Sequence, residues 1–240
     1  MEKKLSIIIP CYNEENFIDT LLNNILEGSL PNTISKELIV VNDGSTDDSM
    51  KLIEQFKSKQ PGCNMMIVNH PENKGKGSCI KSGIQYATGD YIIIQDADLE
   101  YDPKDYGKMV SLFLENQADV VYGSRFRTGD AHRVLFFMHT IGNKFLTFLS
   151  NLFTQLNLTD MECGYKMFRA EILKNIQLQE ERFGFEPEVT AKISRIKNIR
   201  IYEIGISYHG RTYADGKKIK WQDGFRALYC ILKYNLFVRK

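Results

Sequence analysis

The sequence lacks the features that mark several large classes of protein. Its five cysteines never form a C-x-x-C pair, so the sequence indicates neither a zinc site nor a disulfide framework and favours a reducing environment. No apolar run reaches about 18 residues, so no segment is expected to span a bilayer. The apolar run at residues 5–9 is too short for a secretory signal. These absences predict a cytoplasmic protein.

An excess of charge of one sign is also missing. The 31 Lys and Arg and 30 Asp and Glu side chains give a formal net charge of +1, so bulk charge predicts no nucleic-acid partner. Neither the P-loop nor the dinucleotide G-x-G-x-x-G pattern occurs. With 43% hydrophobic and 25% charged residues over 240 positions, the composition is typical of a globular chain, and we expect one domain over residues 1–240.

Predicted strands alternate with predicted helices along most of the chain. Short apolar runs bounded by turn residues predict strands at 5–10, 37–41, 65–68, 91–95, 119–122 and 199–206. Helical periodicity predicts helices at 13–26, 45–56, 77–87, 103–114 and 183–193, the second capped by Ser45 or Thr46 and the fourth with Pro103 in its first turn. This alternation predicts an α/β fold with a mostly parallel central sheet and helices on both faces.

The stretch from Gly89 to Pro103 carries the strongest functional signal. The buried strand predicted at 91–95 runs directly into Asp96, Asp98 and Glu100. Alternate spacing points Asp96 and Asp98 to the same side, and hard oxygen ligands so placed suit Mg²⁺ or Mn²⁺. A solvated acidic loop is the alternative.

Polar clusters at the other strand ends favour the metal site over the acidic loop. Residues 12–14, 42–45 and 73–77 each follow a predicted strand. In a parallel sheet these carboxyl ends lie along one edge, where ligands bind. The Gly-Lys-Gly turn at 75–77 would bring backbone N–H groups and Lys76 to that edge, although a plain glycine turn is the alternative.

The second half of the chain has long amphipathic stretches. Residues 131–159 contain no Asp or Glu up to Thr159, and apolar side chains recur there every three or four positions, in one helix or in two hinged at Gly142. Residues 211–240 carry eight Lys or Arg against two Asp, with an apolar face at 221–237. Both stretches could pack in the core, form a dimer or lie in a membrane interface.

Several motifs together resemble the family-two glycosyltransferases of GT-A fold, closest to the dolichyl- and polyprenyl-phosphate hexosyltransferases, which include the mannosyl- and glucosyl-phosphate lipid synthases. The motifs are S-I-I-I-P-C-Y-N-E-E, V-V-N-D-G-S-T-D-D-S, N-K-G-K-G, A-T-G-D-Y-I-I-I-Q-D-A-D and G-S-R-F, followed by D-M-E-C-G-Y-K-M-F-R and R-T-Y-A-D-G-K-K-I-K-W. The resemblance covers essentially the whole chain. It implies a nucleotide-sugar-binding half at 1–127 and an acceptor-binding half at 128–240, with membrane-interface helices at 131–159 and 221–237.

The resemblance also implies roles for individual residues. The nucleotide would be bound by Pro10, Tyr12, Glu14, Asp43, Lys76 and Asp96. The ion, Mg²⁺ or Mn²⁺, would be bound by Asp96, Asp98 and Glu100. The acceptor phosphate would be bound by Arg125, Arg133, Arg211 and Lys218. The reacting groups would lie against Asp96, Asp98 and Arg125, which the resemblance makes the catalytic residues.

The function implied is a metal-dependent, inverting transfer of a hexose from a UDP-glucose or GDP-mannose type of donor to a polyprenyl or dolichyl phosphate. The enzyme would act as a peripheral protein on the cytosolic face of a membrane, and a homodimer is one candidate assembly. A lipid phosphate is already anionic and needs no general base. The alternative is a soluble transferase acting on a polysaccharide hydroxyl, which needs a base such as Asp160 or Glu162. A catalytically silent homologue that binds a nucleotide sugar is a third hypothesis.

Overall fold

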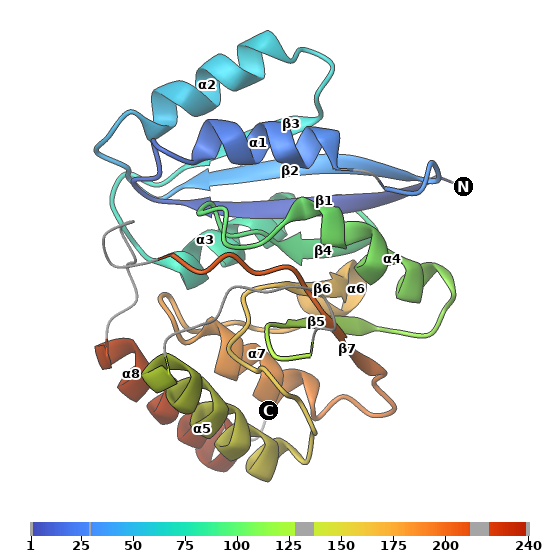
Figure 1. The fold of residues 1–240 in the computed structure, drawn as a ribbon, viewed down its shortest axis with the longest axis vertical. Coiled ribbons are helices and arrows are strands. Elements are labelled where there is room, and N and C mark those ends of the chain that lie inside the picture. Colours follow the sequence, from blue (N-terminus) through green and yellow to red (C-terminus); the bar gives the residue numbers. More distant parts are fainter. Residues whose placement is uncertain (1, 29, 128–136, 212–220, 239–240) are drawn as a thin grey trace.

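A seven-stranded sheet forms the centre of the computed structural model, which describes residues 2–28, 30–127, 137–211 and 221–238 (Figure 1). The strands are β1 (Lys3–Cys11), β2 (Ile34–Asn42), β3 (Met65–Asn69), β4 (Tyr91–Ile94), β5 (Val120–Ser124), β6 (Lys166–Arg169) and β7 (Ile201–Gly205). Their order is β3-β2-β1-β4-β6-β5-β7. All neighbouring pairs are parallel except the two that involve β6, which is antiparallel to β4 and to β5.

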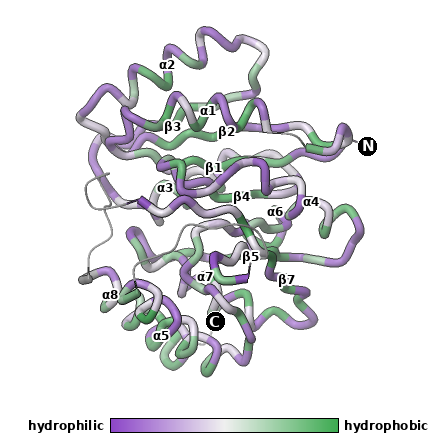
Figure 2. The backbone as a smooth tube through the Cα atoms, in the orientation of Figure 1, coloured by the Kyte–Doolittle hydropathy of each residue, from purple (hydrophilic) through white to green (hydrophobic). Residues whose placement is uncertain are grey.

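Helices cover both faces of this sheet because its strands are apolar on both sides. In β1, Leu5, Ile7 and Ile9 pack into one core, whereas Ile8 packs into the other. The first core contains side chains of α1 (Ile18–Glu27), α2 (Ser49–Lys59) and α4 (Tyr106–Leu114), and the second those of α3 (Lys76–Tyr86), α6 (Ala170–Lys174) and α7 (Phe185–Ile193). The central strands are correspondingly hydrophobic along the chain (Figure 2). The predicted α/β class is confirmed.

Two further helices, α5 (Phe137–Thr154) and α8 (Trp221–Leu232), lie side by side at one end of the molecule, where both contact α7 (Figure 1). A π-helical turn at Lys233–Phe237 continues α8. The outer faces of both helices are apolar and exposed, at Phe137, Met138, Ile141, Phe145, Phe148 and Leu152 on α5 and at Phe225, Tyr229 and Leu232 on α8. In the described part of the chain, no helix is both long and apolar enough to cross a membrane.

The antiparallel strand β6 was not predicted from the sequence. It begins with Lys166, whose charge interrupts the apolar pattern that marks a buried strand. The structure buries this ammonium group completely and satisfies it with the backbone carbonyls of Met161 and Cys163. A lysine that bonds to nearby carbonyls can therefore lie inside a sheet, but its sequence neighbours do not reveal it.

Predicted helix starts were wrong where side chains bind across loops. Ser45 and Thr46 do not cap α2, which begins at Ser49. The Ser45 hydroxyl instead accepts from the backbone N–H of Asn13 at 3.0 Å, and the Thr46 backbone N–H donates to the Asn13 side chain at 2.8 Å. Asn13 itself has a φ of 50°, so α1 begins later, at Ile18.

In the described part of the amphipathic stretch at 131–159 there is one helix, and it has no hinge at Gly142. Helix α5 runs through Gly142 without a break, and an added Cβ at this glycine would meet nothing within 4 Å. The glycine therefore lies in the middle of an exposed helical surface. Residues 131–136 fall outside the described residues.

Candidate active site

A pocket of about 840 Å³ opens beyond the carboxyl ends of three neighbouring parallel strands, β1, β2 and β4. Its lining includes Pro10 and Tyr12 at the end of β1, Asp43 after β2, and Asp96 and Asp98 after β4. The opposite wall comes from the inner sides of α5 and α8. The predicted meeting of the strand ends is confirmed, and the pocket joins the two halves of the chain.

Asp43 holds the glycine-rich loop against the sheet edge. Its carboxylate accepts hydrogen bonds from the backbone N–H groups of Lys74, at 3.0 Å, and Gly75, at 2.7 Å, and from His70 at 2.8 Å. Burial by itself would raise the pKa of Asp43, but these hydrogen bonds outweigh it and lower the pKa below its ordinary value. Asp43 is therefore an anion with its oxygens already engaged in fixing the turn that carries Lys76.

Lys76 brings a positive charge to the first carboxylate of the acidic motif. Its ammonium group lies 2.8 and 3.0 Å from the two oxygens of Asp96 and 3.0 Å from Glu186, a residue 110 positions further along the chain. Gly164 allows this close packing, since a Cβ there would lie 2.4 Å from Asp96. Burial and the nearby Asp98 charge raise the pKa of Asp96, although Lys76 opposes them.

Arg211 brings a positive charge to Asp98, the second carboxylate of the acidic motif, as Lys76 does to Asp96. Its guanidinium lies 2.9 Å from Asp98 and 3.2 Å from both oxygens of Glu14. Its backbone N–H donates to Glu100 at 2.7 Å, and the other Glu100 oxygen accepts from Tyr208 at 2.9 Å. Burial and the neighbouring Glu100 charge raise the pKa of Asp98. Both aspartates are thus about four-fifths buried and are crowded by like charge.

Arg125 reaches the pocket from the end of β5, and Asp160 fixes its orientation. The two side chains form a bidentate ion pair with both distances at 2.7 Å, and the Asp160 carboxylate also accepts from the Arg125 backbone N–H at 3.0 Å. Asp160 has no exposed surface and does not line the pocket. As placed, it positions Arg125, and of the two predicted candidate bases only Glu162 faces the pocket.

Glu162 is a carboxyl group of unusual environment in that wall. Its Oε1 atom is buried and has no hydrogen-bond partner among the described residues. Burial, together with the charge of Glu186, raises the pKa of Glu162 to about 7. At neutral pH the group therefore exists in both protonation states.

The charges of the described pocket residues favour a bound cation. Eight acidic side chains line the pocket: Glu14, Asp43, Asp96, Asp98, Glu100, Glu162, Glu186 and Asp223. Four basic ones do: Lys76, Arg125, Arg182 and Arg211. Carboxylate oxygens are the ligands that Mg²⁺ and Mn²⁺ prefer. Asp96 and Asp98 already pair with the positive charges of Lys76 and Arg211. The carboxylate oxygens of the pocket therefore fit a divalent ion.

Most residues predicted for the site come together, and some were missed. The described pocket contains Pro10, Tyr12, Glu14, Asp43, Lys76, Asp96, Asp98, Glu100, Arg125, Glu162 and Arg211. Arg133 and Lys218 lie outside the described residues. Sequence reasoning missed Glu186, Arg182 and the Tyr101–Tyr208 aromatic pair, whose ring centroids lie 5.5 Å apart. An acidic residue inside the otherwise buried α7 was the available signal for Glu186.

Comparisons with known proteins identify a family and relatives for this chain. The sequence model of glycosyl transferase family 2 matches residues 6–177. The chain is 29% identical to a dolichyl-phosphate beta-glucosyltransferase of Dictyostelium discoideum, over 90% of this chain and 68% of the relative. It is also 29% identical to a dodecaprenyl-phosphate galacturonate synthase of Rhizobium johnstonii, over 98% of this chain and 68% of the relative.

A solved structure has the same fold at lower identity. Glucosyl-3-phosphoglycerate synthase from Mycobacterium tuberculosis, in complex with Mn²⁺, UDP and glucosyl-3-phosphoglycerate, superposes with a TM-score of 0.73 at 18% identity. The match covers 97% of this chain and 80% of the synthase. This likeness confirms the GT-A fold.

Proposed function

The chain belongs to glycosyl transferase family 2, and from this premise we propose that it transfers a hexose from a nucleoside diphosphate sugar to a polyprenyl phosphate with inversion at the anomeric carbon. Two relatives that match most of the chain carry dolichyl phosphate and dodecaprenyl phosphate in their names. The observation that carries the proposal is the difference between the two walls of the pocket. One wall holds the strand-end carboxylates, and the other is formed by two helices whose outer faces are exposed and apolar.

In this proposal the donor binds at the strand ends. Pro10, Tyr12, Glu14 and Asp43 surround the nucleoside, and Lys76 lies beside its diphosphate. Asp96, Asp98 and Glu100 hold Mg²⁺ or Mn²⁺, which when bound neutralises charge on the leaving diphosphate. Asp96 and Asp98 are the acidic residues nearest the strand end, so they orient the leaving group along the sheet edge.

The acceptor enters from the side of α5 and α8. A phosphate monoester is already anionic at neutral pH, so it needs no proton acceptor before it attacks the sugar. Arg125 and Arg211 both line the pocket and can position it. The orientation of Arg125 is the more firmly fixed of the two, because its guanidinium forms two hydrogen bonds with Asp160, which lies outside the pocket lining. Arg133 and Lys218 remain predicted phosphate ligands.

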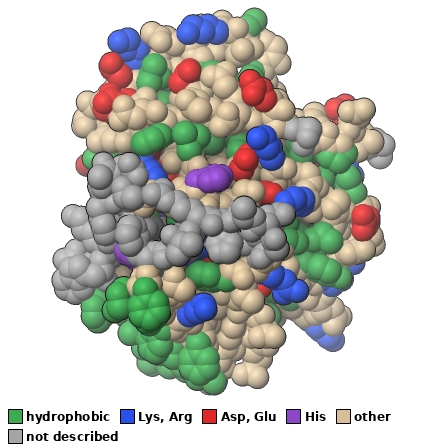
Figure 3. Space-filling model, in the orientation of Figure 1, with side chains coloured by type: hydrophobic (Ala, Val, Ile, Leu, Met, Phe, Trp, Pro, Cys, Tyr) green, Lys and Arg blue, Asp and Glu red, His purple; other side chains and the backbone are tan. Residues whose placement is uncertain are grey.

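The apolar outer faces of α5 and α8 form the surface on which the lipid arrives. Exposed Phe145 and Phe148 lie on the side of α5 away from the pocket, whereas His139 and Asn143 on the same helix line the pocket. Apolar side chains gather over α5 (Figure 3). An exposed apolar face with a nearby Lys144 suits the interface of an anionic bilayer. The protein would then act as a peripheral enzyme on the cytosolic membrane face.

A transfer assay tests the proposal. Purified protein is incubated with radiolabelled UDP-glucose or GDP-mannose, with polyprenyl phosphate or an oligosaccharide as acceptor, in Mg²⁺, Mn²⁺ or EDTA. We expect a labelled lipid phosphate with one of the donors, in the presence of metal, and at least a hundredfold less in EDTA. Asp98→Asn is expected to lose the activity to a similar extent. Labelling of the oligosaccharide alone would overturn the lipid acceptor.

Glu162 supports a second candidate function, transfer to a sugar hydroxyl. A hydroxyl acceptor needs a general base, and a carboxyl group with a pKa of about 7 that faces the pocket is suited to that role. In that case Glu162→Gln would abolish transfer to an oligosaccharide. With a lipid phosphate as acceptor, the same substitution should leave most of the activity.

A further inference from the structure

Arg211 is held in a position that excludes the divalent ion from Asp98. One Asp98 oxygen lies 2.9 Å from the Arg211 guanidinium, and the other accepts the backbone N–H of Glu100 at 3.2 Å. Neither oxygen is thus without a partner. A positive charge at this distance also repels a second cation. An ion can bind Asp98 well only when the guanidinium has left.

The side chain of Arg211 can leave while its backbone stays. The backbone N–H is fixed to Glu100 at 2.7 Å, and that of His209 is bound to the Glu100 carbonyl at 2.9 Å. By contrast, both contacts with Glu14 measure 3.2 Å, which is long for charge-assisted hydrogen bonds. Movement of the guanidinium away from Asp98 would therefore leave these two backbone hydrogen bonds intact.

An anion in the pocket would give the Arg211 guanidinium a new partner in place of Asp98. The Nε atom of Arg211 is buried and has no partner among the described residues, so the guanidinium keeps one donor that no carboxylate uses. Guanidinium groups bind phosphate through two parallel donors. A phosphate that binds the Arg211 guanidinium would release Asp98 from its ion pair. A divalent ion that binds Asp98 would likewise release the Arg211 guanidinium.

We propose that Arg211 is a counter-cation that competes with the divalent ion for Asp98 and is released by it to bind the acceptor phosphate, so that metal and acceptor each strengthen the binding of the other. The acceptor half of this inference rests on the proposed function. The metal half does not, because it concerns only Asp98, Arg211 and the ion. By thermodynamic linkage the two effects must be equal in size.

Metal binding to the free protein tests the metal half without any reaction. Mn²⁺ is titrated into wild type, Arg211→Gln and Arg211→Lys, and free Mn²⁺ is measured by electron paramagnetic resonance. We expect Arg211→Gln to bind Mn²⁺ roughly tenfold more tightly, within the usual range of a coupling between two ligands. Arg211→Lys should fall between the two, since it keeps the charge but not the fork that bridges Asp98 and Glu14.

Arg182→Gln is the matched control, because Arg182 lines the same pocket and carries the same charge. Its effect measures the general attraction that follows from removing one positive charge. The gain in Mn²⁺ affinity in Arg211→Gln must exceed the gain in Arg182→Gln. If Arg211→Gln binds Mn²⁺ no more tightly than Arg182→Gln, or more weakly than wild type, the competition does not exist. A thermal scan of each variant identifies any that fail to fold, and Arg211→Lys then carries the test.

Geranyl phosphate, a water-soluble isoprenyl monophosphate, tests the acceptor half. At a saturating concentration it should tighten Mn²⁺ binding to wild type by about the factor gained in Arg211→Gln, and should not tighten it further in that variant. Equal tightening in both proteins would overturn the exchange. If wild type transfers no hexose to polyprenyl phosphate while Arg211→Gln still binds Mn²⁺ more tightly, the proposed acceptor is wrong and the metal competition stands.

Discussion

Glu162 shows how one side chain takes its chemistry from its neighbours. Its carboxyl group lies in a wall that also contains Glu186, and its Oε1 atom is buried without a partner among the described residues. Burial and the Glu186 charge both disfavour the ionised form, which places the pKa near 7 instead of the ordinary 4.5. An isolated glutamate in the sequence gives no sign of such a shift.

This shift makes the folding stability depend on pH. The folded state keeps the Glu162 proton up to about pH 7, whereas the unfolded chain releases it near pH 4.5. Stability should therefore fall as the pH rises from about 4.5 to 7 and change little above that range, by up to roughly 3 kcal/mol at about 1.4 kcal/mol per unit. Melting temperatures of wild type and Glu162→Gln measured from pH 4.5 to 8 should diverge in this window. Parallel curves would contradict the raised pKa.

At the scale of elements, the turn from Gly75 to Gly77 is packed between the sheet edge and a distant loop. The backbone carbonyl of Glu181 accepts from the Ser78 N–H at 3.0 Å. A Cβ at Gly77 would lie 2.4 Å from the carbonyl oxygen of Glu180, and Gly75 has a φ of 99°. The glycines are needed because two backbones meet here, and this contact places Lys76 between Asp96 and Glu186.

Substitution of Gly77 should therefore disturb both stability and donor binding. We expect Gly77→Ala to lower the free energy of unfolding by about 2 kcal/mol, because the methyl group must push the Glu180–Glu181 backbone away. UDP affinity should fall as well, since Lys76 moves with the turn. Gly62→Ala is the control, as nothing lies within 4 Å of a Cβ at that position. Urea unfolding and UDP titration measure the two effects. Equal results for both variants would remove the packing argument.

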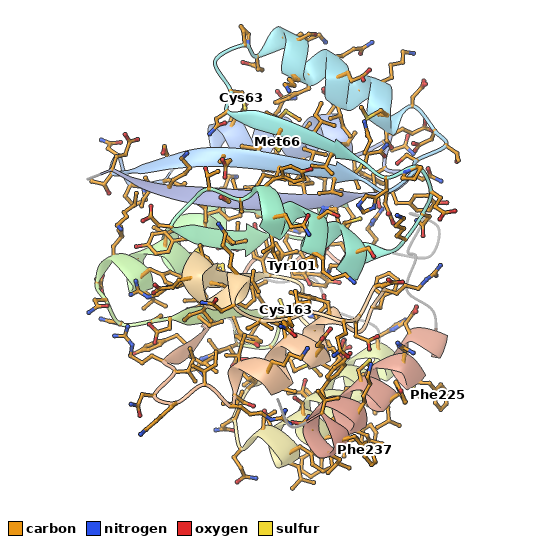
Figure 4. All side chains as sticks on the ribbon, turned by 180° about the vertical axis from the view of Figure 1, so that it is seen from behind. Cys63, Met66, Tyr101, Cys163, Phe225 and Phe237 are labelled. Atoms are coloured by element: carbon orange, nitrogen blue, oxygen red, sulfur yellow. The ribbon has the colours of Figure 1, made fainter. Side chains whose placement is uncertain are left out.

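At the scale of the whole molecule, strands β1, β2 and β3 and the exposed apolar helices α5 and α8 lie at opposite ends, with the pocket between them. Phe225 and Phe237 lie at the end formed by α8, whereas Met66 lies on β3 at the other end (Figure 4). Tyr101 and Cys163 lie in the interior between these ends, where Tyr101 stacks on Tyr165 at 4.9 Å. A surface bound at α5 and α8 would thus meet the pocket from the side on which we propose that the acceptor enters.

Removing this apolar surface should separate membrane binding from chemistry. The double substitution of Phe145 and Phe148 to Glu is expected to weaken binding to anionic phosphatidylglycerol vesicles more than tenfold, since each buried aromatic side chain contributes roughly 1.5–3 kcal/mol. Transfer to water-soluble geranyl phosphate should persist. Met66→Glu, which changes another exposed apolar residue at the far end, is the control for vesicle flotation. Absence of vesicle binding by wild type, together with a stable dimer in solution, would instead assign this face to a second copy.

The sequence could predict the fold class and the location of the site because both follow from local pattern. Apolar runs of strand length alternating with helical periodicity require a mostly parallel sheet, and such a sheet gathers its strand ends at one edge. Residues that lie directly after a strand, such as Asp43, Asp96 and Asp98, could therefore be assigned to the pocket. The start of α2 could not be predicted, since Ser45 and Thr46 bind Asn13 across a loop.

What the sequence alone determined is thus the α/β class with its parallel strands, the edge at which those strands end and the acidic motif at the end of β4, but not the antiparallel strand β6. Only the tertiary structure decided which charges meet: Lys76 between Asp96 and Glu186, Asp160 behind Arg125, and Arg211 on Asp98 although 197 positions separate it from Glu14, which it also binds. Periodicity is a property of neighbouring residues, and the backbone hydrogen bonds enforce it locally. Ion pairs between distant segments depend on how whole elements pack. The spacing of two residues along the chain does not give the distance between their charged groups in the folded protein.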